Sequence, residues 1–336
     1  MRRFVIYLVF AAGAAAILAY FLLFRSNVSI KETPYVYIRD GATLEQLIDS
    51  LNMHHQLSAE TDFRRWAAWL DFKTPRGGRF KLTEGMSSRS LVKHLQRGEQ
   101  SAVKVVLNNE LRPINVAAKA ARFIMADSSS IAELLQDSTF LDSLGGYSEN
   151  TIMSVFIPNT YQLYWNTDAR GFLERMKKEH DRFWTDERKA LASAQQLDPA
   201  QAYTMASLVD GETNIASEMP DVAGLYLNRL HLPMPLQADP TVQFALIQAQ
   251  GGTWRRLTNA DYRFRHPYNT YLFEGLPPGP VGMPGVAAIE AVLKPTQHDY
   301  IYMVAKPDNT GAHAFSRTYE EHLVKVKQFT DWLNSR

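Results

Sequence analysis

The chain has 336 residues, which is enough for two domains of ordinary size, and 46% of them are hydrophobic, so a sizeable core can form. Its 36 Lys and Arg residues balance 35 Asp and Glu residues, giving a net charge of +1. This balance gives no electrostatic case for binding nucleic acid, so no nucleic-acid partner is expected. The chain has no Cys, which excludes disulfides, thiolate zinc sites and a cysteine nucleophile.

The N-terminal segment is predicted to cross a membrane. The 20 residues from Val5 to Phe24 contain no charge and, at about 1.5 Å per residue, span about 30 Å, the thickness of a bilayer core. A signal peptide is the competing interpretation, but its apolar region usually has about 7 to 15 residues. A core helix is the other alternative, although such helices are rarely apolar on all sides. Arg2 and Arg3 favour a cytoplasmic N-terminus, while Arg25 weakens the asymmetry.

Residues 26–108 contain an internal repeat. The stretch 40–51, DGATLEQLIDSL, matches the stretch 84–95, EGMSSRSLVKHL, 44 positions later. In each copy Thr43 or Ser87 fits a helix N-cap, and the apolar residues that follow form one helical face. Short runs of β-favouring residues cover 35–38, 79–82 and 103–107. The segment is therefore predicted to be a small α+β module with two similar halves.

The middle of the chain is predicted to be mainly helical. Apolar periodicity favours helices over residues 115–125, 131–144 and 171–195. The run 155–164, VFIPNTYQLY, is consistent with a turn at Pro158-Asn159 followed by a strand. Toward the C-terminus, residues 284–293 are predicted to form a short helix and residues 300–304 a buried strand, while 244–247 fits either.

Glu212 is the candidate catalytic residue. Ala202, Met205, Leu208 and Val209 fall on one face of a helix, and Glu212 is the next position on that face. A Glu there stands where the pattern predicts core, and desolvation raises the pKa of a carboxyl group that has no cation nearby. Such a group can hold a proton near neutral pH, as a general acid must. The alternative is that Glu212 caps the helix end in solvent.

The residues around and after Glu212 resemble a known family. A second helix is expected after it, with Pro220 in its first turn. The runs ASLVDGET (206–213), NRL (228–230) and MPLQADPTV (234–242) resemble the endolytic murein transglycosylases, the MltG or YceG-like family. The strings YNTY (268–271), GLPPGP (275–280) and HAF (313–315) are similar to further elements of that family.

This resemblance implies an α+β fold in three parts. Residues 1–25 would be a cytoplasmic tip and a transmembrane helix, residues 26–108 a small LysM-like α+β module, and residues 109–336 a larger mixed α+β catalytic domain. The protein would be anchored in the bacterial inner membrane by a single span, with the N-terminus in the cytoplasm and the catalytic domain in the periplasm. The LysM-like module would contact glycan or serve only as a spacer, since no aromatic platform for sugar stacking is obvious.

The resemblance also implies the reaction. Endolytic lytic transglycosylases cleave the MurNAc–GlcNAc bond of peptidoglycan glycan strands and leave 1,6-anhydroMurNAc ends. One carboxyl group is sufficient, because the 6-hydroxyl of the substrate's own muramic acid is the nucleophile. The resemblance places this general acid and base role on Glu212. It implies glycan strands as substrate, no cofactor, and the peptidoglycan synthesis machinery as a further partner.

Seven further residues are expected to bind the glycan or to stabilise the positive charge that develops at the anomeric carbon. They belong to the matching strings, and they are Asn228, Gln237, Asp239, Thr241, Tyr268, Asn269 and Tyr271. The YNTY string combines a stacking face with several hydrogen-bonding groups, which is the mixture that a sugar requires.

Two other functions stay open. A muramidase-type hydrolase of the same bond normally needs a second carboxylate, for which Asp210, Glu218 and Asp239 are the candidates. Asp210 is expected to point to another side of the helix, and Asp239 to set a turn before Pro240. A non-catalytic glycan-binding scaffold is the other alternative, and the intact ET and DPTV strings argue against it.

The sequence offers no support for other chemistry. It has no HExxH pattern, no set of metal ligands and no glycine-rich phosphate loop. His313 is expected to be structural, as a lone His usually is. Asn159 stands where the family usually has an acid, which puts a charge role for that position in doubt. An aminodeoxychorismate lyase activity is discounted, because it needs a pyridoxal phosphate lysine and the matching strings centre on a Glu.

Overall fold

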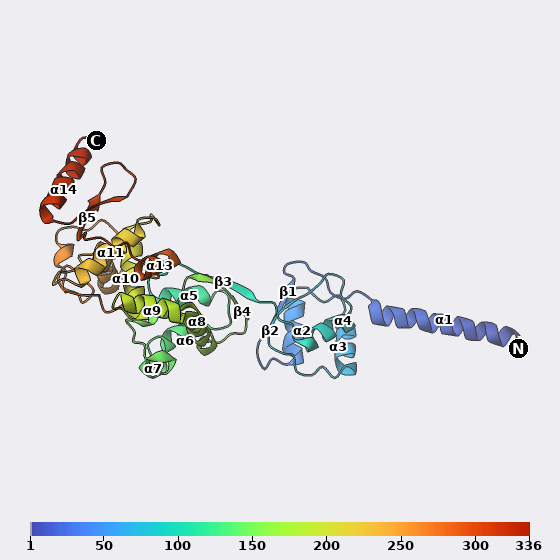
Figure 1. Cartoon of the computed structure of the whole chain (residues 1–336). Helices are drawn as coiled ribbons and strands as arrows, with labels where there is room; N and C mark the ends of the chain where they lie inside the picture. The colour runs from blue at the N-terminus through green and yellow to red at the C-terminus, as the bar shows by residue number, and fades with distance from the viewer. Residues whose placement is uncertain (1) are drawn as a thin grey trace. The chain divides into compact units, whose positions relative to one another are not determined.

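The chain forms two compact units in the computed structural model (Figure 1). The structure describes residues 2–336, apart from the side chains of residues 2, 3, 5, 18, 19, 21 and 22. The first unit comprises residues 1–105, 123–126 and 162–168. The second unit comprises residues 106–122, 127–161 and 169–336. Each unit is described below by itself.

Helix α1 (Arg2–Phe24) covers the segment predicted to cross a membrane. Several side chains of the predicted span, Val5 among them, lie outside the described residues. Over the residues that the structure describes, no helix combines the length and the apolar character needed to cross a membrane. The expected transmembrane helix and single-pass inner-membrane anchor stay predictions.

The repeat in the first unit forms the two expected helices, α2 (Leu44–Met53) and α4 (Ser88–Arg97). The unit also contains β1 (Tyr35–Ile38), α3 (Glu60–Trp69) and β2 (Gly78–Lys81), with β1 antiparallel to β2. The predicted N-caps are confirmed, because the hydroxyls of Thr43 and Ser87 accept the backbone N–H groups of Gln46 and Ser90. The apolar faces of both helices pack with Phe63 in one core. The likeness of this module to LysM stays a prediction.

The rest of the chain is mainly helical. Its elements are β3 (Val103–Leu107), α5 (Pro113–Ala120), α6 (Ser128–Leu134), α7 (Ser138–Gly145), a 3₁₀ turn (Ile152–Val155), β4 (Asn159–Leu163), α8 (Ala169–Phe183), α9 (Asp186–Ala194), α10 (Pro199–Glu212), α11 (Met219–Leu230), α12 (Asp239–Gln250), a second 3₁₀ turn (Asp261–Arg263), α13 (Val286–Leu293), β5 (Tyr302–Ala305), β6 (His313–Ser316) and α14 (Tyr319–Asn334). β3 pairs with β4, and β5 is antiparallel to β6. The predicted α+β fold class is confirmed, with only small sheets.

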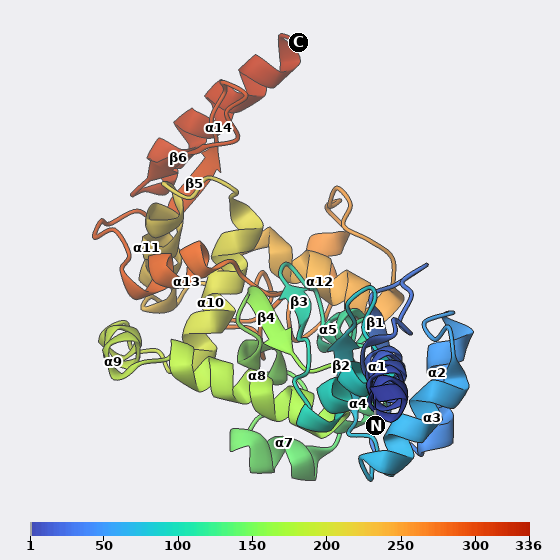
Figure 2. The ribbon, with the colours of Figure 1, turned by 90° about the vertical axis from the view of Figure 1, so that its right-hand side faces the viewer.

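Helix α10 forms the centre of the second unit. It contacts α11, α12 and α13, as Figure 2 shows. Asp198 caps its start by accepting the backbone N–H of Gln201, and Pro199 occupies its first turn. Residues 202–209 are all buried, so the helix is covered on every side and not along one face alone.

Four details of the predicted elements are wrong. The helix expected over 115–125 ends at Ala120. The helix expected over 131–144 is two helices, because the Asp137 carboxylate accepts the N–H groups that open α7. The helix expected over 171–195 is likewise divided into α8 and α9, where the Thr185 hydroxyl accepts the N–H of Arg188. The strand expected to be buried from Tyr300 begins at Tyr302, and its residues are only partly buried.

Candidate active site

Glu212 is the last residue of α10, and it lies against the start of α12. The preceding Gly211 permits this approach, because a Cβ at that position would lie 2.6 Å from Cγ of Pro240 in the first turn of α12. The backbone N–H of Asp239 hydrogen bonds the Glu212 carboxyl group. A helix N-terminus stabilises a nearby carboxylate, so this contact offsets part of the cost of burying its charge.

The surroundings of Glu212 raise its proton affinity. Burial raises the pKa of Glu212 to about 7, and the charge of Asp239 adds to the rise. The hydrogen bonds from Tyr226 and from the Asp239 N–H, together with the nearby His313, act in the opposite direction. The hydroxyl of the fully buried Tyr226 donates to Oε1 of Glu212 at 2.7 Å. Although protein surrounds it, Glu212 keeps partial solvent exposure, so a ligand can reach a group that is partly protonated near neutral pH.

Asp239 places a second carboxylate close to Glu212. Its Oδ1 accepts the hydroxyl of Tyr271 at 2.7 Å and its Oδ2 accepts that of Tyr262 at 3.2 Å. Burial raises the pKa of Tyr262 to about 12 and raises that of Tyr271 as well, so both hydroxyls stay protonated donors. Asp239 is therefore more than the turn residue that the sequence suggested. Tyr262 was not predicted, since it lies in a 3₁₀ turn outside the matching strings.

Glu218 is engaged with a different segment. Its Oε1 accepts the backbone N–H of His313 at 2.5 Å, and its Oε2 lies 3.0 Å from Nδ1 of that ring and accepts the Thr213 hydroxyl at 2.9 Å. Burial by itself would raise the pKa of Glu218, but these hydrogen bonds hold it below its usual value. The three residues thus join the segment after Glu212 to the start of β6.

Asp210 contacts a different segment from Glu212, directly before α13. Its Oδ1 accepts the backbone N–H of Gly285 at 3.1 Å, and burial raises its pKa. Together with Gly211 and Trp254 it lines a cavity of about 490 Å³.

Three of the predicted binding residues use their polar groups to hold the backbone. Asn228 donates to the carbonyl groups of His298 and Tyr300 before β5. Asn269 is fully buried, donates to two carbonyl groups of the loop before it and accepts the N–H of Tyr271. The buried hydroxyl of Thr241 donates to the carbonyl group of Ala238. These contacts explain the residue types without a ligand.

The remaining predicted binding residues are dispersed. Tyr271 lies beside Glu212 through its bond to Asp239, whereas Gln237 is exposed, with a φ of 52°. Tyr268 is buried and lines a second cavity, of about 170 Å³. Glu212 itself lines neither cavity, although its neighbour Gly211 lines the larger one. In the described part of the chain, no cluster of His, Asp and Glu could hold a metal ion.

Comparison with known proteins gives one consistent result. The profile of the YceG-like family matches residues 36–328. An endolytic murein transglycosylase of Bacillus subtilis (strain 168) is 25% identical over 321 residues, which cover 91% of this chain and 87% of that protein. One from Streptococcus pneumoniae serotype 2 is also 25% identical, and the match covers 90% of this chain but only 59% of the longer pneumococcal protein. The crystal structure of a yceG-like protein from Listeria monocytogenes matches with a TM-score of 0.57 and 25% identity, covering 86% of this chain and 97% of that one.

Proposed function

Because the chain belongs to the YceG-like family, we propose that it has the activity for which its relatives are named, endolytic murein transglycosylation. The substrate is the glycan strand of peptidoglycan, and the reaction takes place outside the cytoplasm, where murein lies. The bond cleaved is the MurNAc–GlcNAc bond, and the product is a 1,6-anhydroMurNAc end. The peptidoglycan synthesis machinery stays a predicted partner.

The observation on which this proposal depends is the environment of Glu212. With a pKa of about 7, the carboxyl group is protonated often enough at neutral pH to donate a proton to the glycosidic oxygen. The C1–O bond then breaks, and positive charge develops at the anomeric carbon. The resulting Glu212 carboxylate accepts the proton of the muramic 6-hydroxyl as its oxygen bonds to C1. Glu212 is thereby reprotonated, and no water is consumed.

Asp239 has a supporting role in this scheme. A carboxylate near Glu212 stabilises the developing positive charge, and it keeps the proton affinity of Glu212 high. The hydroxyls of Tyr262 and Tyr271 hold its two oxygens in place. Tyr226 similarly fixes Oε1 of Glu212.

A hydrolase of the same bond is the second candidate, because Asp239 supplies a second carboxylate near the acid. In that reaction Asp239 would activate a water molecule or attack the sugar. Both of its oxygens already accept a tyrosine hydroxyl, which competes with a water molecule or a sugar for them and favours the one-carboxylate mechanism. A scaffold that only binds glycan would not need a carboxyl group with a pKa of about 7.

Product analysis tests the proposal. The wild-type protein should release muropeptides with anhydro ends from purified sacculi, whereas a hydrolase would give reducing ends, heavier by one water. Glu212→Gln keeps the acceptor for Tyr226 but has no proton to exchange, so cleavage should fall by roughly 10²- to 10⁴-fold. Glu274→Gln, at an exposed position of the same unit, should cleave normally. Anhydro products released by the Glu212→Gln protein at the wild-type rate would refute the role of Glu212.

A further inference from the structure

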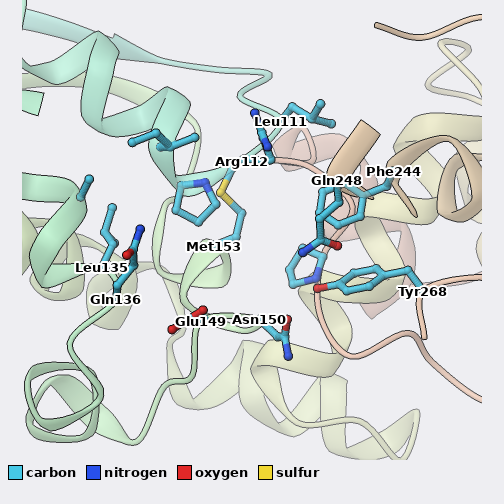
Figure 3. A pocket seen from close by; sticks show the side chains of 14 residues that line it. Leu111, Arg112, Leu135, Gln136, Glu149, Asn150, Met153, Phe244, Gln248 and Tyr268 are labelled. Carbon is cyan, nitrogen blue, oxygen red and sulfur yellow. The ribbon is translucent and has the colours of Figure 1, made fainter. Parts of the chain in front are cut away.

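The smaller cavity has no role in the mechanism above. It has a volume of about 170 Å³ and lies between the α5–α6 region and α12. Figure 3 shows Leu135 and Gln136 on one side of it and Phe244, Gln248 and Tyr268 on the other. The cavity therefore has apolar, aromatic and amide walls within the second unit.

Arg112 supplies the positive charge of this cavity. It lines the cavity directly before α5, and its Nε is buried without a hydrogen-bond partner. Over the described part of the chain, its guanidinium group forms no ion pair or hydrogen bond. Glu149 also lines the cavity, but it lies on the opposite side from Arg112 in Figure 3. A partly buried guanidinium without a partner has lost hydration that a bound carboxylate would replace with paired hydrogen bonds.

The other walls fit an amino sugar. Tyr268 packs against Phe244, with 4.7 Å between ring centroids. Burial raises the pKa of Tyr268 to about 12, so its hydroxyl stays a donor at neutral pH. The exposed amide groups of Gln136 and Gln248 can hydrogen bond hydroxyl and acetamido groups. An aromatic face, two amides and one guanidinium together match a sugar that bears both an acetamido group and a carboxylate.

Helix α12 relates this cavity to Glu212. Its N-terminus contacts Glu212 through Asp239, and it contributes Phe244 and Gln248 to the cavity. At about 1.5 Å per residue, these two positions lie about 7 and 14 Å along the helix from Asp239. Leu111 lines both this cavity and the larger one beside Gly211. The two cavities are thus adjacent, and together they extend from the residue next to Glu212 to Arg112.

We propose that the cavity at Arg112 is a subsite that binds the carboxylate borne by a muramic acid residue at a distance from the bond being cleaved. This inference rests on the proposed function and adds to it a residue that recognises the strand. The carboxylate belongs either to the lactyl group of a muramic acid residue that carries no stem peptide or to the stem peptide itself, because attachment of the peptide converts the lactyl carboxylate into an amide. An enzyme that cuts within a strand gains from such a contact, because it fixes the register of the strand relative to Glu212.

Binding to the full-length Glu212→Gln protein tests the subsite without turnover. The probes are glycan strands with stem peptides, strands stripped of peptides by an amidase, and peptide-bearing strands whose carboxyl groups are methyl esters. Adding Arg112→Ala should weaken binding of the strands that carry the recognised carboxylate, peptide-bearing or stripped, about tenfold and leave binding of the esterified strands unchanged. Arg112→Lys should recover part of the loss, because it keeps the charge without the planar fork. Arg122→Ala, at an exposed position after α5 in the same unit, should have no effect.

The stripped strands identify the source of the carboxylate. A loss confined to the stripped strands indicates the lactyl carboxylate, which is an amide in peptide-bearing strands, whereas a loss confined to peptide-bearing strands indicates the peptide. The inference is overturned if Arg112→Ala has no effect on either kind, or weakens the esterified strands equally. Thermal melting checks the fold of the Arg112→Ala protein. The melting temperature should be unchanged, since the Asn115 side chain caps α5 through the backbone N–H of Arg112, which the substitution keeps.

Failure of the proposed function looks different. If Arg112→Ala weakens strand binding but the wild-type protein yields no anhydro ends, the transglycosylase activity is refuted and the subsite is not. If the wild-type protein produces anhydro ends but Arg112→Ala does not change strand binding, only the subsite is refuted.

Discussion

At the scale of single residues, Glu212 lies between groups with opposite effects on its proton. Burial and Asp239 favour the protonated form, whereas Tyr226 and the N-terminus of α12 favour the charged form. Since the acid must be protonated to start the reaction, kcat/KM should fall as the pH rises through about 7. The position of this alkaline limb therefore reports the pKa of Glu212.

Two substitutions should move this limb in opposite directions. Tyr226→Phe removes a hydrogen bond to the charged form, so the pKa of Glu212 should rise and the limb should move to higher pH. Asp239→Asn removes a nearby negative charge, so the limb should move to lower pH, in addition to any loss of rate. The measurement is the pH profile of kcat/KM with soluble glycan strands.

The matched control is Tyr203→Phe. Tyr203 is also a fully buried tyrosine of this core, but its hydroxyl donates to the carbonyl group of Phe156. Its loss should leave the limb in place. Shifts of the same sign in the Tyr226 and Asp239 variants would show that Glu212 is not the titrating acid.

At the scale of elements, the approach of α10 to α12 positions the acid. Gly211→Ala would put a Cβ 2.6 Å from Pro240 and force the two helix ends apart. We expect a loss of about 1–3 kcal/mol in the free energy of unfolding and a fall in kcat, because Glu212 would move from the N-terminus of α12. Urea unfolding and steady-state kinetics measure the two effects.

Gly282→Ala provides the comparison. A Cβ there would meet its nearest neighbour, the Glu110 carbonyl oxygen, at 3.9 Å, an ordinary contact. A Gly211→Ala protein that matched it in both stability and kcat would contradict the positioning role assigned to the helix contact.

Sequence patterns predicted the elements better than their ends. Apolar periodicity continued through Asp137 and Thr185, although both residues are N-caps that open new helices. In the repeat, Thr43 and Ser87 precede the first apolar residue of each helix, so cap and periodicity agree there and the prediction was correct. Helix boundaries could be predicted from the sequence only where the cap signal coincides with the apolar pattern.

At the scale of the whole molecule, the site joins residues far apart in the chain. Tyr226 is 14 residues from Glu212, while Tyr262 and Tyr271 are 23 and 32 residues from Asp239. The helical pattern placed Glu212 on the apolar side of α10, because that position is local information, and the strings that resemble the family assigned its role. The same strings predicted Asn228, Asn269 and Thr241 as binding residues, and nothing local indicated that the backbone would use their polar groups.

The burial of Glu212 should also make the free energy of unfolding depend on pH. Its folded pKa of about 7 exceeds the ordinary value of 4.5, so the folded protein binds the extra proton and stability should fall as the pH rises from about 4.5 to about 7. Glu212→Gln lacks this penalty and should be more stable than the wild type at pH 8 by roughly 1–3 kcal/mol, discounted for partial exposure. Near pH 4 the difference should vanish. Denaturant unfolding at both pH values measures it, and an equal difference at both would contradict the burial of a titrating acid.

The most direct test is a titration of Glu212 itself. Carbon NMR of the side-chain carboxyl groups, with the Glu212→Gln protein to assign the resonance, reports its pKa without substrate. The account predicts a midpoint near 7. A midpoint at or below the ordinary 4.5 would mean that Glu212 is charged at neutral pH and cannot be the proton donor.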